Sequence, residues 1–199
     1  DYDEDNNGGA FDITSGAITL QDLTLENNST STSGDDGGAI YASTGCSSLT
    51  IDRCIFKDNV SYISSSSDGS CIFTEATTSL IQNCLFYDNT CRSTSTNGHV
   101  FIDDGTATIV NCTFTENGSG SPLYLYSDAD NSHVVKNCIF YIPTSSYFAI
   151  YLAWIRDVEI VQNPEGNVLN GHTGNPLFGS SSSTSPSQLL SKPSQISPA

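Results

Sequence analysis

Apolar residues recur along this chain in short runs that are separated by polar turns. Five of the runs follow one template: an aliphatic residue, then Leu or Cys three positions later, Leu or Phe two positions after that, and Asn or Pro a further three along. Runs of this length predict β-strands, and no segment shows convincing helical periodicity. The chain is therefore expected to be all-β.

The template aligns the five runs into columns of like residues. The aliphatic column contains Leu20, Ile51, Ile81, Ile109 and Val135. The Cys column contains Leu23, Cys54, Cys84, Cys112 and Cys138. The Phe column contains Leu25, Phe56, Phe86, Phe114 and Phe140. The Asn column contains Asn28, Asn59, Asn89 and Asn117, and it ends on Pro143.

A second family of strand-like segments lies between these runs, and its clearest members begin Gly8-Gly9-Ala10 and Gly37-Gly38-Ala39. Successive Phe-column positions are 31, 30, 28 and 26 residues apart. A solenoid accommodates such variation in its surface turns while the core columns stay in register. We therefore predict a single-stranded right-handed parallel β-helix of about six coils, with a β-sandwich as the alternative fold.

The same pattern predicts three parts of the chain. Residues 1–7 form an acidic N-terminal segment, and residues 8–178 form the β-helix domain. Residues 179–199 form a Ser/Pro-rich extended tail that is expected to pack on the solenoid or on a neighbouring subunit. Because the chain contains no Met, even at position 1, we expect a processed product or a piece of a longer protein.

The repeat pair resembles a known group of proteins. Gly37-Gly38-Ala39-Ile40 alternates with Phe-x-x-Asn at residues 56–59, 86–89 and 114–117. This pattern is similar to the repeats of chlamydial polymorphic outer-membrane proteins and to the wider pectin-lyase-like β-helix superfamily. The stretch Asn175-Pro176-Leu177-Phe178 is similar to the closing stretch of secreted β-helix proteins. The resemblance implies the fold, but the superfamily includes lyases, hydrolases, adhesins and structural proteins.

Charge limits the partners. The chain has 22 Asp and Glu against 6 Lys and Arg, which gives a formal net charge of -16. Phosphate groups are held by Lys and Arg, so we expect no nucleic acid, no anionic membrane surface and no polyanionic substrate such as pectate. No apolar stretch approaches the roughly 18 residues that a membrane-spanning helix needs, so no membrane insertion is expected.

Seven Cys and five N-glycosylation sequons favour an extracellular or cell-surface glycoprotein. The sequons lie at Asn27, Asn28, Asn59, Asn111 and Asn117. The Cys column is expected to project inward. Its thiols either fill the core as small apolar side chains or form disulfides between neighbouring coils, and both alternatives stay open. The Cys residues show no spacing typical of a metal site.

Carboxylates are the candidates for chemistry. Aligning Cys71 with Val100 places Glu75 and Asp104 at matching positions on adjacent coils, with Asp103 beside Asp104. Two carboxylates roughly 5 Å apart suit a retaining glycosidase, and they could also bind Ca²⁺. A polar turn on an acidic surface explains the same residues. The chain lacks the complete catalytic sets of β-helix lyases and polygalacturonases, so we expect no catalysis and no required cofactor.

Aromatic residues gather toward the C-terminal coils. Tyr124, Tyr126, Tyr151 and Trp154 could form a contact face that stacks on sugar or on another subunit, although core packing would also explain them. We expect a non-catalytic structural or adhesive protein, as the repeating subunit of an extracellular filament that assembles by end-to-end stacking. The alternatives are a carbohydrate-active enzyme and a carbohydrate-binding module.

Overall fold

The structure of this protein, a computed structural model, describes nine segments of the chain. They are residues 7–30, 34–61, 68–91, 98–126, 132–141, 150–153, 157–161, 168–170 and 178–180. Beyond residue 141, only Ile150 has a described side chain. Most of the predicted N-terminal segment and the tail from residue 181 onward lie outside the described residues. No helix in the described segments is long and apolar enough to cross a membrane.

The described strands form three long sheets and one short one. Sheet A has seven strands: β1 (Phe11–Ile13), β4 (Ile40–Ala42), β8 (Ile72–Thr74), β12 (Gly98–Asp103), β15 (Ser121–Tyr126), β18 (Ile150–Ala153) and β21 (Phe178–Ser180). Sheet B has six: β2 (Gly16–Gln21), β5 (Cys46–Asp52), β9 (Thr78–Gln82), β13 (Thr106–Val110), β16 (Ser132–Lys136) and β19 (Asp157–Val161). Sheet C also has six: β3 (Thr24–Glu26), β6 (Ile55–Lys57), β10 (Leu85–Tyr87), β14 (Thr113–Thr115), β17 (Ile139–Tyr141) and β20 (Val168–Asn170). Sheet D pairs β7 (Val60–Ser61) with β11 (Thr90–Cys91).

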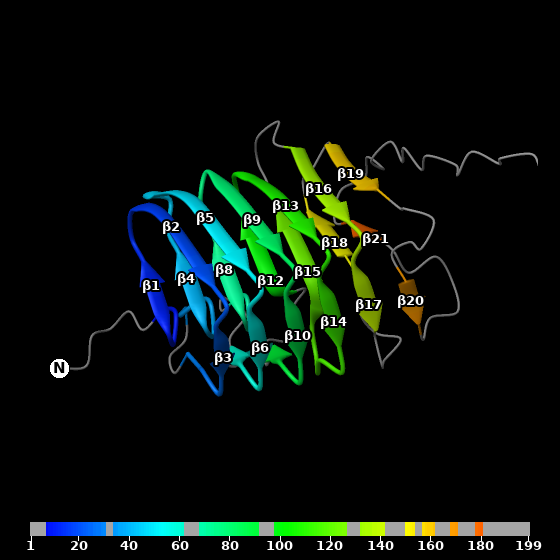
Figure 1. Ribbon diagram of the computed structural model, residues 1–199, viewed down its shortest axis with the longest axis horizontal. Coiled ribbons are helices and arrows are strands. Elements are labelled where there is room, and N and C mark those ends of the chain that lie inside the picture. Colours follow the sequence, from blue (N-terminus) through cyan, green and yellow to red (C-terminus); the bar gives the residue numbers. More distant parts are fainter. Residues whose placement is uncertain are drawn as a thin grey trace, which may run out of the picture.

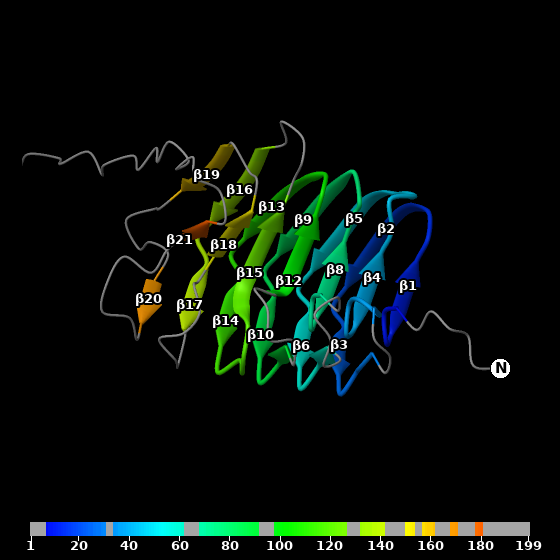
Figure 2. The same ribbon diagram turned by 180° about the vertical axis from the view of Figure 1, so that it is seen from behind.

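Each strand pairs in parallel with its equivalent on the next coil, so the chain winds as the predicted β-solenoid (Figure 1). The register puts Phe56 beside Phe86, and Phe86 beside Phe114. It also puts Ile51 beside Ile81. Columns of like residues in the sequence are therefore columns of neighbours in space. The view from behind shows sheet A as one wall of the rod (Figure 2).

Two columns of left-handed residues make the bends between the sheets. Asp22, Arg53, Asn83, Asn111 and Asn137 have positive φ and immediately precede the Cys column. Asn27, Asp58, Asp88 and Glu116 have positive φ and immediately precede the Asn column. Asn and Asp tolerate this conformation better than most residues, which explains their frequency there. The residue immediately before each Cys-column or Asn-column position therefore makes the turn between two sheets.

The Gly-Gly-Ala motif makes the bend that leads into sheet A. Gly37 has a φ of 66°, and a Cβ there would lie 2.1 Å from the carbonyl oxygen of Ile40. A Cβ on Gly38 would lie 2.1 Å from the carbonyl oxygen of Ser70 on the next coil. The first Gly is therefore needed for its conformation, and the second for the close approach of two coils.

The Phe column forms a continuous stack in the interior. The rings of Phe56 and Phe86 have centroids 4.7 Å apart, those of Phe86 and Phe114 are 4.5 Å apart, and those of Phe114 and Phe140 are 5.2 Å apart. All four rings are fully buried. Interplanar angles of 12° or less show that they lie nearly parallel. The predicted aromatic core is confirmed by this geometry.

The Asn column forms a hydrogen-bonded ladder at the bend after sheet C. The Oδ1 of Asn59 accepts hydrogen bonds from the backbone N and the Nδ2 of Asn28. The Nδ2 of Asn59 donates to the Leu25 carbonyl oxygen at 2.9 Å and to the Oδ1 of Asn89 at 3.0 Å. Asn89 bonds in the same way to Asn117. Each buried amide therefore satisfies backbone and side-chain groups on two coils.

The Cys column is buried, and its thiols face backbone carbonyl groups. The Sγ of Cys84, for example, lies 3.0 Å from the carbonyl oxygen of Gln82 and 3.8 Å from that of Ile51. All seven Cys are free and buried. The Cys column therefore fills the core with small buried thiols, and the coils are not joined by disulfides.

Candidate functional site

A second aromatic row runs along the outer face of sheet A. The rings of Tyr41, Phe73, Phe101 and Tyr124 stack in that order, with centroids 5.6, 5.3 and 4.4 Å apart. This row is separate from the main core, because alternate side chains of a strand point to opposite faces. The faces of the rings pack against one another, so a sugar ring cannot stack on the middle of the row.

The structure corrects one part of the predicted contact face. Tyr124 is only 8% exposed and stacks on Phe101, so it is not a surface contact. Tyr126 is half-buried. Tyr151 pairs in register with Tyr124, but its side chain is not among those described, and Trp154 lies outside the described residues. The aromatic row also begins earlier than predicted, at Tyr41 in the second coil.

The carboxylates of sheet A meet in a different combination from the predicted one. The register pairs Val100 with Ile72 and Ile102 with Thr74, so one residue further along it is Asp103, not Asp104, that lies beside Glu75. The predicted pairing of Glu75 with Asp104 is wrong because the alignment behind it was one residue out. Such a slip exchanges the two faces of a strand.

Asp104 has a different role. It adopts a φ of 68° in the turn after β12 and is exposed, while its backbone N donates to the carbonyl oxygen of Tyr126. The residues that share the outer face of sheet A are Glu75 and Asp103, both half-buried. The Oη of Tyr41 donates a hydrogen bond of 3.2 Å to the Oε2 of Glu75. Burial, followed by the charge of Glu75, raises the pKa of Tyr41 to about 12.

Two further carboxylates belong to this cluster and were missed in the sequence. Asp36 and Asp68 precede the Gly residues that lead into β4 and β8. The Oδ1 of Asp36 accepts a hydrogen bond of 2.7 Å from the backbone N of Asp68, and Asn7 does the same for Asp36 at 2.6 Å. A sequence signal for them exists, since Asn7, Asp36, Asp68 and Asn97 each precede a Gly at the entry to a strand of sheet A.

Burial perturbs both of these carboxyl groups. It raises the pKa of Asp36 to about 7, with the charges of Asp68, Asp103 and Glu75 adding to the effect. Burial and the charge of Asp103 raise the pKa of Asp68 to about 6. A protonated carboxyl group near ionised ones is the arrangement that general acid and base catalysis uses. We name Asp36, Asp68, Glu75 and Asp103, together with Tyr41, the sheet A acidic cluster.

The two described histidines, His99 and His133, are buried in the solenoid. His99 is fully buried, and its Nδ1 lies 2.7 Å from the Oγ of Ser70 and 3.8 Å from the Sγ of Cys91. Burial lowers the pKa of His99 to about 3 and that of His133 to about 4, so both are neutral at physiological pH. This interior Ser–His–Cys contact contributes to packing, and it has no access to solvent.

No set of three His, Cys, Asp or Glu side chains in the described segments is arranged to hold a metal ion. The sheet A acidic cluster therefore offers carboxylates without the geometry of a Ca²⁺ site.

The sequons fall into two groups. Asn27 and Asn111 are exposed. Asn59 and Asn117 are 0% and 5% exposed, and the Nδ2 of each is used in the ladder, so the fold leaves no room for a glycan there. Asn28 is half-buried and donates its Nδ2 to Asn59. Glycosylation at all five sequons stays a prediction, and the ladder disfavours it at Asn59 and Asn117.

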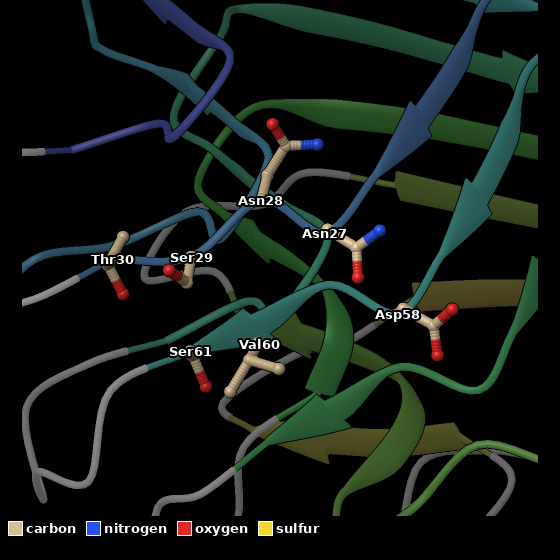
Figure 3. Close-up of a pocket in the computed structure, with 7 residues that line it drawn as sticks. All are labelled: Asn27, Asn28, Ser29, Thr30, Asp58, Val60 and Ser61. Carbon is tan, nitrogen blue, oxygen red and sulfur yellow. The ribbon is translucent and has the colours of Figure 1, made fainter.

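A hollow of about 280 Å³ lies beside the first of these sequons (Figure 3). It is lined by residues of the first two coils, namely Asn27, Asn28, Ser29, Thr30, Asp58, Val60 and Ser61. Its walls carry hydroxyl, amide and carboxylate groups around one apolar side chain. This lining suits a small neutral polar ligand better than an anion.

Three parallel sheets made of equivalent strands from successive coils are the architecture of a β-helix protein. The chain belongs to the family described as the right-handed β-helix region, whose profile matches residues 3–163. A search of curated proteins found no match, and a search of solved structures found none.

Proposed function

We propose that this chain is a non-catalytic structural or adhesive module of the extracellular space or the cell surface. The observation that carries the proposal is the commitment of its Phe, Asn and Cys side chains to interior ladders that run through successive coils. Such ladders hold each coil to the next and make a stiff rod, which is what a structural or adhesive protein requires. The likeness of the repeats to chlamydial polymorphic outer-membrane proteins supports a surface location.

The net charge of -16 supports the same proposal. It keeps the rod soluble and disfavours contacts with phosphate-bearing partners. Assembly end to end is the form of the proposal that we favour, since an added coil would continue all the ladders. An added coil would fit in the same way whether it came from more of the same chain or from a second copy.

The test uses protein taken from its native source without denaturant. Protease treatment of intact cells should release the chain if it lies outside the cell. Negative-stain electron microscopy should then show fibres with an axial repeat near roughly 30 Å or a small multiple, because six coils are spaced at about 4.8 Å. Protection from the protease would overturn the location, and monodisperse single particles would overturn filament assembly.

A second candidate function is hydrolysis of a neutral glycan at the sheet A acidic cluster. The observation in its favour is the raised pKa of Asp36, to which the charges of Asp68, Asp103 and Glu75 contribute, together with the outer face of sheet A that Glu75 and Asp103 share. Release of reducing ends from neutral polysaccharides tests it, with Glu75→Gln and Asp103→Asn as variants and the exposed Glu26→Gln as the control. Turnover that both variants abolish and the control retains would establish an enzyme and overturn the non-catalytic proposal.

The third candidate, a carbohydrate-binding module, is weaker because the ring faces of the sheet A row are occupied by one another. The half-buried Tyr126 is the described aromatic side chain of the predicted contact face that remains for it. Glycan-array binding that Tyr126→Ala abolishes would favour this candidate over the other two.

A further inference from the structure

The Asn ladder separates the sequons that can carry a glycan from those that cannot. An N-linked glycan replaces one hydrogen of Nδ2 and needs open space around that atom. In Asn59 the Nδ2 hydrogens go to the Leu25 carbonyl oxygen and to Asn89, and in Asn117 the Nδ2 donates to the Phe86 carbonyl oxygen. Both side chains are also buried, so modification of either residue is incompatible with its place in the ladder.

Asn27 is in the opposite situation. Its side chain is exposed, and its Nδ2 donates no hydrogen bond to a described residue. Asn111 is exposed as well, but its Nδ2 donates to the Oδ1 of Asn83 at 3.2 Å, and its Oδ1 accepts from Asn137. Of the two exposed sequons, Asn27 is the one whose modification breaks no hydrogen bond within the described segments.

The groups that line the hollow beside Asn27 could hold a single sugar residue, and we call this hollow the sugar cradle. In Figure 3 the side chains of Asn27 and Asp58 point to one side, away from Ser29, Thr30 and Val60, which line the rest of the hollow. The carboxylate of Asp58, whose Oδ2 lies 3.4 Å from the Nζ of Lys57, can still accept from the hydroxyl or acetamido N–H groups of a sugar. Val60 adds methyl groups to the lining. A volume of about 280 Å³ is small for a drug-sized ligand and fits a single sugar residue.

We propose that Asn27 carries an N-linked glycan whose first, acetamido-bearing sugar lies in this hollow, and that the Asn ladder leaves Asn59 and Asn117 unmodified in the folded protein. The proposal rests on the proposed extracellular location. In the transfer step the Nδ2 of Asn27 bonds to C1 of the sugar, and the bond from C1 to the oxygen of a lipid pyrophosphate donor breaks. The lipid pyrophosphate leaves, and Nδ2 loses one proton.

Overlapping sequons allow the site to be assigned by substitution. Ser29→Ala removes the sequon of Asn27 and keeps that of Asn28, whereas Thr30→Val does the reverse. The chain is secreted from a host that N-glycosylates, and the folded monomer is analysed by glycopeptide mass spectrometry. We expect Asn27 to be occupied in the unchanged chain and in Thr30→Val, and to be empty in Ser29→Ala. Equal occupancy of Asn59 or Asn117 in the folded monomer would overturn the proposal.

The cradle is tested by thermal unfolding in a Thr113→Val background, which removes the sequon of Asn111. One sample is trimmed by an endoglycosidase that leaves only the first sugar on Asn27. The reference is the Asn27→Asp variant, which carries no sugar. Asp is already present at the equivalent positions 58 and 88 of the next coils. We expect the one-sugar form to melt about 2–4 °C higher, as about 1 kcal/mol produces in a domain of this size. Val60→Thr should remove most of that difference. Equal melting temperatures would refute the cradle.

The two proposals fail in different ways. Occupancy in a glycosylating host reports on the site whatever the native location is. Protein from the native source that is extracellular but bare at Asn27 would overturn the glycan inference and leave the proposed function standing. Native protein that is intracellular would overturn the proposed function, while the assignment of Asn27 as the accessible sequon would still be judged by the host experiment.

Discussion

The Oδ1 of Asn59 accepts two hydrogen bonds from Asn28, one from its backbone N at 3.0 Å and one from its Nδ2 at 2.9 Å. Asn89 accepts the same pair from Asn59 at 2.9 and 3.0 Å, and Asn117 accepts it from Asn89 at 3.0 Å for both bonds. One side chain thus holds the bend of the preceding coil closed. The repetition of this contact makes each Asn part of a structure that is several coils long.

Asn89→Ala should destabilise the protein strongly. The change leaves the backbone N and the Nδ2 of Asn59 without the oxygen that accepts from both, and it removes the Nδ2 bond to the carbonyl oxygen of Phe56. Each such group costs about 1–3 kcal/mol, so we expect a loss of roughly 3 kcal/mol in urea unfolding. The exposed Thr24→Ala should change stability by less than about 0.5 kcal/mol. A loss of similar size for both variants would contradict the ladder's importance.

The Phe column should show a graded response to Phe→Leu substitution. Phe86 stacks on rings on both sides, whereas Phe56 stacks on one ring and meets Leu25 on the other side. Because a stacked aromatic pair contributes about 0.5–1.5 kcal/mol beyond burial, Phe86→Leu should cost about 1 kcal/mol more than Phe56→Leu. Denaturant unfolding of the two variants measures the difference. Equal losses of stability in the two variants would mean that burial, and not ring stacking, sets the contribution of each Phe.

Asp36→Asn should stabilise the protein in alkaline but not in acidic solution. The folded pKa of about 7 lies above the ordinary value of 3.8, so the folded state binds a proton that the unfolded state has lost. Stability from this group is therefore present below about pH 4 and is lost as pH rises through 7. Because the carboxyl is partly exposed, solvent screening limits the effect to about 1–2 kcal/mol at pH 8. Asn retains the oxygen that accepts from Asp68. A variant no more stable than the parent at pH 8 would refute the raised pKa.

The buried imidazoles of His99 and His133 should stabilise the folded protein at neutral pH and lose this effect as the pH falls. The folded pKa values of about 3 for His99 and about 4 for His133 lie below 6.5, so stability from these groups is present above pH 6.5 and is lost as pH falls toward those values. In nuclear magnetic resonance spectra their ring protons should not shift between pH 8 and 5. Titration of either ring near pH 6.5 would show that it is open to water.

The thiols should react slowly in the folded protein. All seven are buried, and burial raises the pKa of Cys71 and of Cys91, so little thiolate is exposed to a reagent. Labelling with a disulfide reagent should be at least about a hundredfold slower than in urea, where all seven should react. Fewer than seven thiols in urea without a reductant would show that disulfides form in the native protein.

Much of the interior was predictable from sequence. The spacing from Ile51 to Cys54, Phe56 and Asn59 recurs on each coil, and the parallel register then places like residues together. The interior of sheet A was harder. There Val100 pairs with Ile72 rather than with Cys71, and the error of one residue moved Asp104 into the place of Asp103. The segments that lead into sheet A vary in length, so the sequence pattern does not fix that register.

The sequence by itself determined the parallel solenoid and its Phe, Cys and Asn columns, because a repeat whose like residues recur at each coil buries them only by stacking. The tertiary structure alone decided which surface groups meet. It brought Asp36 and Asp68 to Glu75 and Tyr41, and it made Asn59 a ladder amide while it left Asn27 outside. The physical reason is that burial and neighbouring charge depend on how successive coils lie in space, and the same sequon or carboxylate pattern can occur on either side of the wall.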